Sequence, residues 1–168
     1  MDHQRRLRAV VAVSVVLLLA VGGAAATSLP AGQALVVETA DSGDELLRVP
    51  VEENTTVALE YTHSVEKTRV LDGYAVRGGE LVMTRMEFQS YGWGLPARVN
   101  VSQENGSFVF DPDGSYEELY VKPGRIAGHE LHVGDRTYDL VALSDANSVR
   151  IYIADRTLVE VALAMTRS

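Results

Sequence analysis

Short apolar runs alternate with turn residues along most of this chain, and this spacing constrains the fold more than any other feature. The pairs Gly78-Gly79, Asn105-Gly106 and Gly134-Asp135 each separate two runs rich in valine, leucine or tyrosine. Two such runs joined by a short glycine-containing turn are typical of a β-hairpin. After residue 33 no segment has a convincing amphipathic helical pattern. The spacing therefore predicts an all-β, antiparallel domain.

The apolar runs and their flanking turn residues define the strands that we expect. They lie at residues 34–39, 45–51, 56–63, 68–77, 80–89, 98–103, 107–110, 131–133, 136–143, 149–153 and 157–163. So many short strands leave exposed edges unless a sheet closes on itself or two sheets stack. The sequence predicts a small antiparallel barrel or sandwich, and relief of the edges by closure favours the barrel.

The N-terminal segment has the composition of a targeting or anchoring element. Three arginines precede an uncharged run over residues 9–26, which ends in small residues. A basic flank followed by such a run is typical of a secretion signal, and the run also approaches the length of a spanning helix. We expect residues 1–26 to be a hydrophobic helix that anchors the protein, or a signal cleaved near Ala26. A tether over 27–33 and an extracytoplasmic β domain over 34–168 would follow.

The charge balance and the absence of cysteine exclude several classes of partner and site. The chain has 15 lysines and arginines, 23 aspartates and glutamates and a formal net charge of -8. No basic surface is available to neutralise phosphates, so nucleic acid is excluded as a partner. An acidic excess suits high salt, where screening relieves self-repulsion, and the balance resembles that of haloarchaeal proteins. Without cysteine the chain forms no disulfide and no thiolate metal site.

His63 is the first candidate for a binding residue. The alternation that starts at Val57 places His63 on the apolar face of its strand. An inward imidazole needs a partner, so it is either a neutral ring satisfied by a carbonyl or hydroxyl, or a group that contacts a ligand or metal. Ser64 and Glu66 lie beside it in sequence. A serine–histidine–acid triad also needs spatial convergence and an oxyanion site, for which the sequence gives no support.

The stretch over residues 87–96 is the second candidate region, because a strand there breaks into aromatic residues separated by glycines. Gly92 and Gly94 permit positive φ or close backbone approach. Trp93, the single tryptophan, lies between them. Its ring either closes over a hydrophobic interior or forms the wall of a cleft.

The strand before that corner carries charged residues at alternate positions. If Val82, Met86 and Phe88 fill the core, Arg85 and Glu87 lie on the outer face, where they pair with each other or across strands. If the strand instead lines a polar cleft, Arg85 is suited to bind a carboxylate through its bidentate geometry.

Other polar motifs give weaker indications. His129 and His132 are three residues apart, so on a strand they face opposite sides and cannot share a metal ion. We expect no metal and no cofactor. Glycosylation sequons begin at Asn54, Asn100 and Asn105, and these matter only for an exported domain.

Three stretches occur together in one order: Tyr61-Thr62-His63-Ser64-Val65-Glu66-Lys67-Thr68, then Gly78-Gly79-Glu80-Leu81, then Phe88-Gln89-Ser90-Tyr91-Gly92-Trp93-Gly94-Leu95-Pro96. In this order they resemble the family catalogued as domain of unknown function 1850, from about Leu35 to about Leu143. The resemblance implies a small exported accessory protein, encoded beside tripartite ATP-independent (TRAP) transporters of the TAXI type and connected with uptake of an organic solute. Arg85-Met86-Glu87 reverses the charges of the family pattern, which indicates a structural ion pair, and Trp93 replaces a commonly small residue.

These patterns lead to one functional hypothesis and two alternatives. We expect an accessory or solute-binding protein whose partners are a TRAP transporter membrane subunit, a small organic carboxylate and, through the N-terminal segment, the membrane. Its ligand-binding residues are expected where the two motifs meet: His63, Ser64, Glu66, Gln89, Tyr91 and Trp93. The alternatives are a structural cell-envelope domain without ligand, and a hydrolase using His63 with Glu66 or Glu87. We favour a protein that is not an enzyme and assign no catalytic residue.

Overall fold

The structure is a computed structural model that describes residues 30–89 and 101–166. The chain is mostly β, with two short helices in this part. Its elements are β1 (Pro30–Thr39), β2 (Glu45–Val51), β3 (Thr56–Thr62), β4 (Arg69–Arg77), β5 (Glu80–Phe88), β6 (Ser102–Glu104), β7 (Ser107–Phe110), β8 (Ser115–Tyr116), β9 (Glu118–Val121), β10 (Glu130–Val133), β11 (Arg136–Asp139), α2 (Leu140–Ser144), β12 (Val149–Thr157) and α3 (Leu158–Met165).

The chain divides into two compact units. One comprises Gln33–Ala154, and the other comprises Met1–Gly32 together with Asp155–Ser168. Strand β1 begins at Pro30, so the last part of the expected tether belongs to a strand. No helix within the described residues is long and apolar enough to cross a membrane. The apolar run over residues 9–26 lies outside them.

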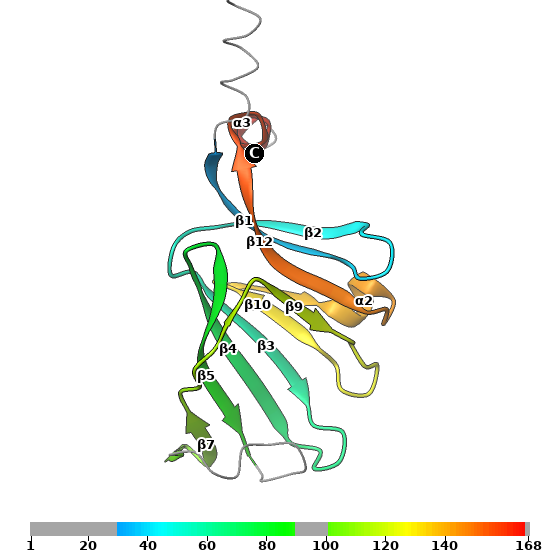
Figure 1. Cartoon of the computed structure of the whole chain (residues 1–168). Helices are drawn as coiled ribbons and strands as arrows, with labels where there is room; N and C mark the ends of the chain where they lie inside the picture. Colours follow the sequence, from blue (N-terminus) through cyan, green and yellow to red (C-terminus); the bar gives the residue numbers. More distant parts are fainter. Residues whose placement is uncertain (1–29, 90–100, 167–168) are drawn as a thin grey trace, which may run out of the picture. The chain divides into compact units, whose positions relative to one another are not determined.

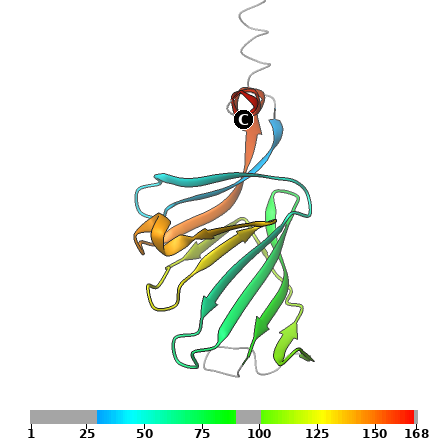
Figure 2. The ribbon, with the colours of Figure 1, turned by 180° about the vertical axis from the view of Figure 1, so that it is seen from behind.

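The strands form two antiparallel sheets and, among the described residues, no closed barrel, so the expectation of a barrel is wrong. The small sheet has the order β2-β1-β12-β9, and the large sheet has the order β11-β10-β3-β4-β5-β7-β6, with β8 paired to β5 (Figures 1 and 2). The glycine turns confirm the predicted hairpins β4–β5, β6–β7 and β10–β11. Each contains at least one residue with positive φ, for example 59° at Gly78 and 84° at Gly106.

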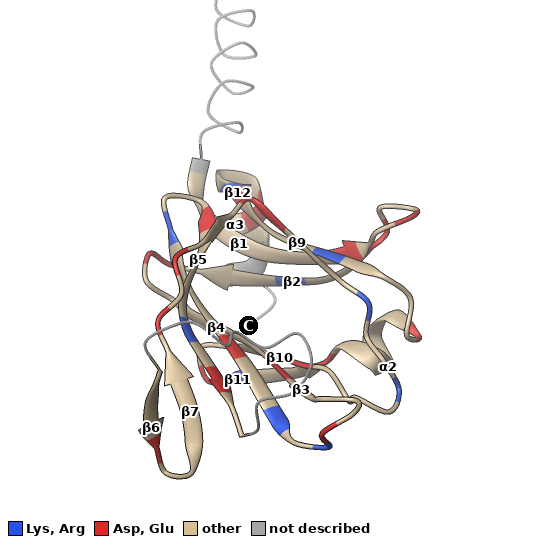
Figure 3. Cartoon of the chain, turned by 60° about the horizontal axis from the view of Figure 1, so that its bottom comes forward, with Lys and Arg blue, Asp and Glu red and all other residues tan. Residues whose placement is uncertain are grey.

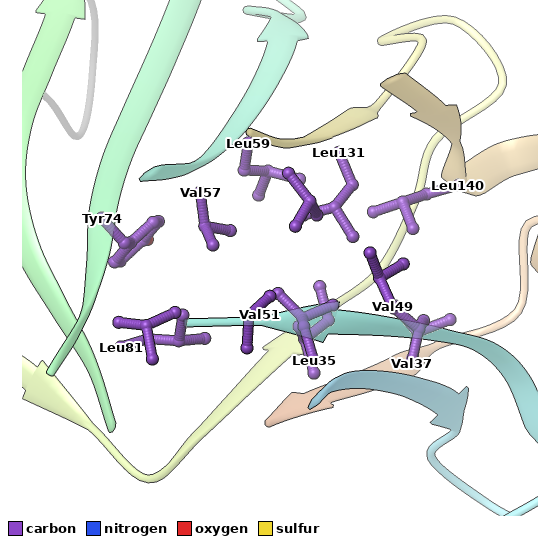
Figure 4. Close-up of a cluster of buried hydrophobic side chains, with 14 residues drawn as sticks. Leu35, Val37, Val49, Val51, Val57, Leu59, Tyr74, Leu81, Leu131 and Leu140 are labelled. Atoms are coloured by element: carbon purple, nitrogen blue, oxygen red, sulfur yellow. The ribbon is translucent and has the colours of Figure 1, made fainter. Parts of the chain in front are cut away.

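The two sheets share one hydrophobic core. Leu35 and Val49 of the small sheet lie across from Leu59 and Leu131 of the large sheet (Figure 4). A second, smaller cluster, made of Val70, Phe88 and Phe110, lies on the large sheet. We call the core-facing side of the large sheet its inner face and the opposite side its outer face. Burial of these apolar side chains stabilises the fold by removing their surface from water.

A β-bulge in β5 corrects the expected arrangement of that strand. The β4–β5 register passes from Gly73↔Arg85 to Tyr74↔Met83, so Thr84 is an extra residue on β5. A Cβ atom at Gly73 would lie 3.3 Å from the Arg85 Cβ, so glycine allows the close approach there. The extra residue shifts the alternation.

The residues on either side of the bulge therefore face the core in a different pattern from the one we expected. Leu81 and Met83 reach the main core, and Met86 and Phe88 reach the second cluster. Val82, which fills the core together with Met86 and Phe88 in one of the two sequence alternatives, is only half-buried.

Two helices replace strands that the sequence indicated. Residues 136–143 were expected to be one strand, but β11 ends at Asp139, whose side chain accepts the Ala142 N–H and caps α2. Residues 149–153 and 157–163 were expected to be two strands, but β12 continues through to Thr157. Its end forms a capping box with Glu160, in which each side chain bonds the other residue's backbone N–H. These caps show that the expectation of no helix after residue 33 is wrong.

The small sheet holds one buried carboxylate, and it is fully paired. Glu38 is 8% exposed. It accepts hydrogen bonds from Arg150 at 2.6 and 2.9 Å and from the Tyr152 hydroxyl at 3.0 Å. Arg150 also bonds Glu118 at 2.6 Å, so the cluster joins β1, β9 and β12. Because a buried charge needs partners, this cluster is accounted for by structure alone.

Candidate functional site

The inner face of the large sheet carries a group of polar and aromatic side chains between the two hydrophobic clusters. We call Tyr61, Asp72, Tyr74 and His129 the inner polar cluster. Tyr61 comes from β3, Asp72 and Tyr74 from β4, and His129 from the residue before β10. Strand alternation places Asp72 on the same face as the buried Tyr74, while Tyr61 packs against both hydrophobic clusters.

Asp72 is the electrostatically unusual member of the inner polar cluster. Burial raises the pKa of its carboxyl to about 6, and a hydrogen bond from Tyr61 opposes part of that rise. Its Oδ1 atom is shielded from solvent and has no hydrogen-bond partner. A carboxylate oxygen in this state costs free energy unless something bonds it. The Oδ1 atom of Asp72 can therefore accept a further hydrogen bond on the inner face.

The aromatic neighbours of Asp72 are held in place from both sides. The Tyr61 ring stacks on the His129 ring, with centroids 5.0 Å apart and an interplanar angle of 9°. The His129 Nδ1 atom accepts the Gly124 N–H at 3.2 Å. On the other side, Tyr74 packs edge-to-face against Tyr116 at 6.2 Å. Tyr61 and Tyr74, the two tyrosines that interact with the Asp72 carboxyl group, are thus each held by a further aromatic ring.

Burial shifts the titration of these rings as well. It raises the pKa of Tyr61 to about 12, with the nearby Asp72 charge adding to the effect, and it also raises the pKa of Tyr74. Burial lowers the pKa of His129, and a backbone hydrogen bond with Gly124 opposes part of this shift. Several perturbed groups in one place are a feature of binding and catalytic sites. Tyrosine hydroxyls, a neutral imidazole and an acceptor oxygen can together orient a small polar molecule.

The outer face of the same sheet carries a continuous network of ion pairs. Arg85 bonds Glu87 and, at 2.8 Å, Glu104. Arg69 lies 3.4 Å from Glu87 and 2.8 Å from Glu60. The Arg85–Glu87 pair confirms the ion pair that the sequence indicated. Figure 3 shows acidic and basic positions together on neighbouring strands of this sheet.

The network continues from Glu60 to β10, where the His132 Nε2 atom lies 3.6 Å from Glu60. The hydrogen bond from Arg69 lowers the pKa of Glu60, although its partial burial opposes this. The same bond raises the pKa of Arg69. The arginines and glutamates of this network satisfy one another, so it has the character of a structural feature, whereas the His132 Nε2 atom is buried without a hydrogen-bond partner.

Arg85 lines a surface depression of about 310 Å³, together with Ser102 and Asp111. In the sequence alternative in which this strand lines a polar cleft, Arg85 would bind a carboxylate in this depression. Its guanidinium is already bonded to Glu87 and Glu104, so an added carboxylate would have to compete with two acidic side chains.

His63 lies just beyond the end of β3, in the turn that leads to β4. β3 ends at Thr62, and the chain turns before the alternation reaches His63. The His63 N–H bonds the Thr68 carbonyl, and its Nδ1 atom accepts the Glu66 N–H at 3.2 Å. His63 and Glu66 are half-buried in this turn, and Ser64 is exposed.

The described parts of the two sequence motifs lie at the same end of the large sheet. Val70 of β4 pairs with Phe88 of β5, so the turn before β4 and the exposed Gln89 after β5 are at one edge. Tyr91 and Trp93 lie outside the described residues. The structure thus brings His63, Ser64 and Glu66 together in one turn, with Gln89 at the same end.

The hydrolase alternative lacks a supporting geometry in the described residues. Glu87 bonds Arg69 and Arg85 on the outer face, and the His63 Nδ1 atom is occupied by a backbone N–H. No group of three histidine, aspartate or glutamate side chains suited to a metal ion occurs in the described ranges. Of the sequons, Asn54 and Asn105 are exposed turn residues with positive φ, and Asn100 lies outside the described residues.

Fold and site together define a two-sheet antiparallel β domain with a buried carboxyl group among aromatic rings. Residues 57–140, half of the chain, match the family model described as Domain of unknown function (DUF1850), and the chain belongs to that family. No curated protein and no solved structure matches the chain. The matched segment contains the whole inner polar cluster.

Sequence reasoning missed Asp72, although the chain carried a signal for it. On β4 the inward positions are Val70, Asp72, Tyr74 and Val76, so a single acidic residue interrupts an apolar row. A buried acid within such a row needs an explanation.

Proposed function

We propose that this protein is an exported accessory or solute-binding protein of a TRAP transporter of the TAXI type, and that the inner polar cluster is its ligand contact. The observation that carries the binding role is the Asp72 carboxyl group, whose shielded Oδ1 atom has no hydrogen-bond partner and which lies beside Tyr61, a ring held by stacking on His129. Membership of the family supports the transporter connection. The N-terminal apolar run supports export and anchoring at the membrane.

The chemistry of the inner polar cluster narrows the solute class. Above its pKa of about 6, Asp72 is ionised and accepts hydrogen bonds. A solute carboxylate placed beside it would be repelled, whereas a hydroxyl or ammonium group would be bound. Tyr61 and Tyr74 add aromatic faces that favour a cationic or apolar group. The proposed solute therefore presents a hydrogen-bond donor to Asp72, and any carboxylate that it carries points away from this residue.

A structural envelope domain is the second candidate, and one observation favours it. The main core between the sheets is filled by aliphatic side chains, with Leu35, Leu81 and Leu131 almost fully buried. A filled interior needs no ligand. The two candidates differ in what happens at Asp72, because only the binding role predicts a ligand effect there.

Calorimetric titration at pH 8 in high salt tests the binding role. Organic amines and polyols are compared with carboxylates that have the same carbon skeleton. We expect heat only from solutes with a donor group, and its loss in Asp72→Asn, which keeps the shape and removes the charge. Asp135→Asn, at an exposed turn position, is the matched control and should bind as the unmodified protein does. Binding that survives Asp72→Asn would refute the assignment of this cluster.

Co-purification from native membranes in high salt tests the transporter connection. Mass spectrometry should identify a transporter membrane subunit together with the protein, and gene deletion should reduce solute uptake. Recovery of the protein alone, with uptake unchanged after deletion, would exclude the accessory role and leave the envelope domain.

A further inference from the structure

The second unit of the chain contains a helix whose exposed face is apolar. In α3 the exposed residues with described side chains are Leu158, Val159, Ala162, Leu163 and Met165. The exposed fractions of Leu163 and Met165 are 52% and 76%. A surface helix of a water-soluble domain normally turns its polar side to solvent. α3 has the opposite orientation.

The single charged residue of α3 does not change this character. Glu160 is half-buried, and its carboxylate accepts the Thr157 N–H at 2.6 Å and the Thr157 hydroxyl at 3.2 Å. The charge is therefore placed at the first turn, where a capping box and the helix dipole favour it. The outward face keeps only apolar side chains, and these gain free energy when they leave water.

The place of α3 in the chain indicates what covers this face. β1 and β12 are neighbours in the small sheet, and the Ala40 N–H bonds the Ser148 carbonyl, so the two strands are antiparallel. The start of β1 at Pro30 therefore lies beside the end of β12, where α3 begins (Figures 1 and 2). Only four residue steps separate Ala26, the last residue of the apolar run, from Pro30, and they span at most about 14 Å.

We infer that α3 is an interfacial helix that lies on the bilayer surface with its apolar face in the lipid. This inference rests on the proposed anchoring of the N-terminal run in the membrane, because the short connection then keeps α3 at the membrane surface. An eight-residue helix is about 12 Å long, too short to span the hydrocarbon core. A short helix with an apolar outer face is suited to the interface plane. The N-terminal run and α3 together hold the second unit against the membrane.

Spin labelling of the full chain in vesicles tests this placement, and the cysteine-free sequence makes single labelling sites unambiguous. Leu163→Cys carries the probe, and Val65→Cys, a position 66% exposed in the β3–β4 turn, is the matched control. The vesicles are phosphatidylcholine with a minority of phosphatidylglycerol. We expect collisions with oxygen to exceed those with a water-soluble nickel chelate at Leu163→Cys, and the reverse at Val65→Cys.

A second variant separates lipid contact from general burial. Adding Leu163→Glu to Met165→Cys should shift the Met165 probe towards the nickel chelate, whereas Val65→Glu should leave it unchanged. A Leu163 probe that collides mainly with nickel would overturn the inference. So would a probe shielded from both reagents, which indicates a protein partner, or one with spin–spin broadening, which indicates a second copy.

Vesicle flotation in the same samples separates this inference from the proposed function. If the chain floats and the Leu163 probe is in water, the interfacial helix is wrong and the anchoring stands. If the chain does not float, both the anchoring and the interfacial helix are wrong. Neither result depends on solute binding at Asp72.

Discussion

The pKa values of carboxyl groups shift in opposite directions on the two faces of the large sheet. On the outer face, the hydrogen bond from Arg69 lowers the pKa of Glu60, whereas on the inner face burial raises the pKa of Asp72 to about 6. The two residues lie on adjacent strands, with Leu59 and Glu60 next to each other in β3 and Leu59 paired to Asp72. The difference arises from the partners of each side chain rather than from its position in sequence. Glu60 on the outer face is already bonded to an arginine, whereas the Oδ1 atom of Asp72 on the inner face can still accept a hydrogen bond.

The largest loss of stability should follow truncation of a buried aromatic side chain on the inner face. Phe88 is fully buried in the second hydrophobic cluster. We expect Phe88→Ala to lower the free energy of unfolding by about 3–5 kcal/mol, because it removes buried surface and leaves a cavity. Urea titration followed by circular dichroism in high salt measures this. The exposed neighbour Gln89→Ala should change stability by less than about 0.5 kcal/mol, and equal losses in both variants would contradict the assigned burial.

Asp72 should make stability fall as pH rises. Its pKa is raised from 3.8 to about 6 in the folded state, so the protonated carboxyl favours folding and ionisation opposes it. Between these two values the unmodified protein should lose up to about 3 kcal/mol relative to Asp72→Asn. Urea titrations of both proteins across this range measure the difference, since the other titrating groups are common to both. A constant difference across that pH range would show that Asp72 titrates normally.

Removal of an ion pair from the outer face should lower the free energy of unfolding only slightly, and by an amount that depends on the salt concentration. Arg69→Met removes the cation between Glu60 and Glu87, which are partly exposed to solvent. Exposed ion pairs contribute little, so we expect a loss of about 0.5–1 kcal/mol at low salt, and less in molar salt because of screening. Arg136→Met, at an exposed position of β11, serves as the charge-matched control. A loss that does not change with salt would point to a packing role for Arg69.

The smallest effect concerns the hydrogen bond from Tyr61 to Asp72. This bond stabilises the ionised carboxylate, so its removal in Tyr61→Phe should raise the pKa of Asp72 above its value of about 6. A rise of roughly half a unit corresponds to a weak net hydrogen bond. NMR titration of the Asp72 side-chain carboxyl carbon measures this pKa. An unchanged or lower pKa would mean that the hydroxyl does not bond the carboxylate.

The sequence was most informative where a local signal decides the structure. The hairpin turns at Gly78-Gly79, Asn105-Gly106 and Gly134-Asp135 follow from the backbone freedom of glycine and asparagine. The choice between a closed barrel and two sheets depends on which strands pair at long range, and no local pattern specifies that. Similarly, the end of β3 at Thr62, before His63, depends on the hydrogen bonds of the following turn.

The candidate site was harder to predict than the fold. Stacking of His129 on Tyr61 brings together residues 68 positions apart in the chain, which no spacing rule indicates. The capping signals for α2 and α3 were visible at Asp139 and at Thr157 with Glu160, but the valine- and leucine-rich runs after them also fit strands. Asp72 was recognisable only from the inward row of β4, once the strand boundaries were known.

The bulge at Thr84 decides which side chains of β5 enter the interior. If Thr84 instead took a regular strand position, the half of the strand beyond it would rotate by one position. Arg85 and Glu87 would then enter the interior, and Phe88 would point to water. Deleting Thr84 would remove the bulge and leave Phe88 on the inner face, so the domain should tolerate loss of this residue better than loss of the bulge with the residue retained.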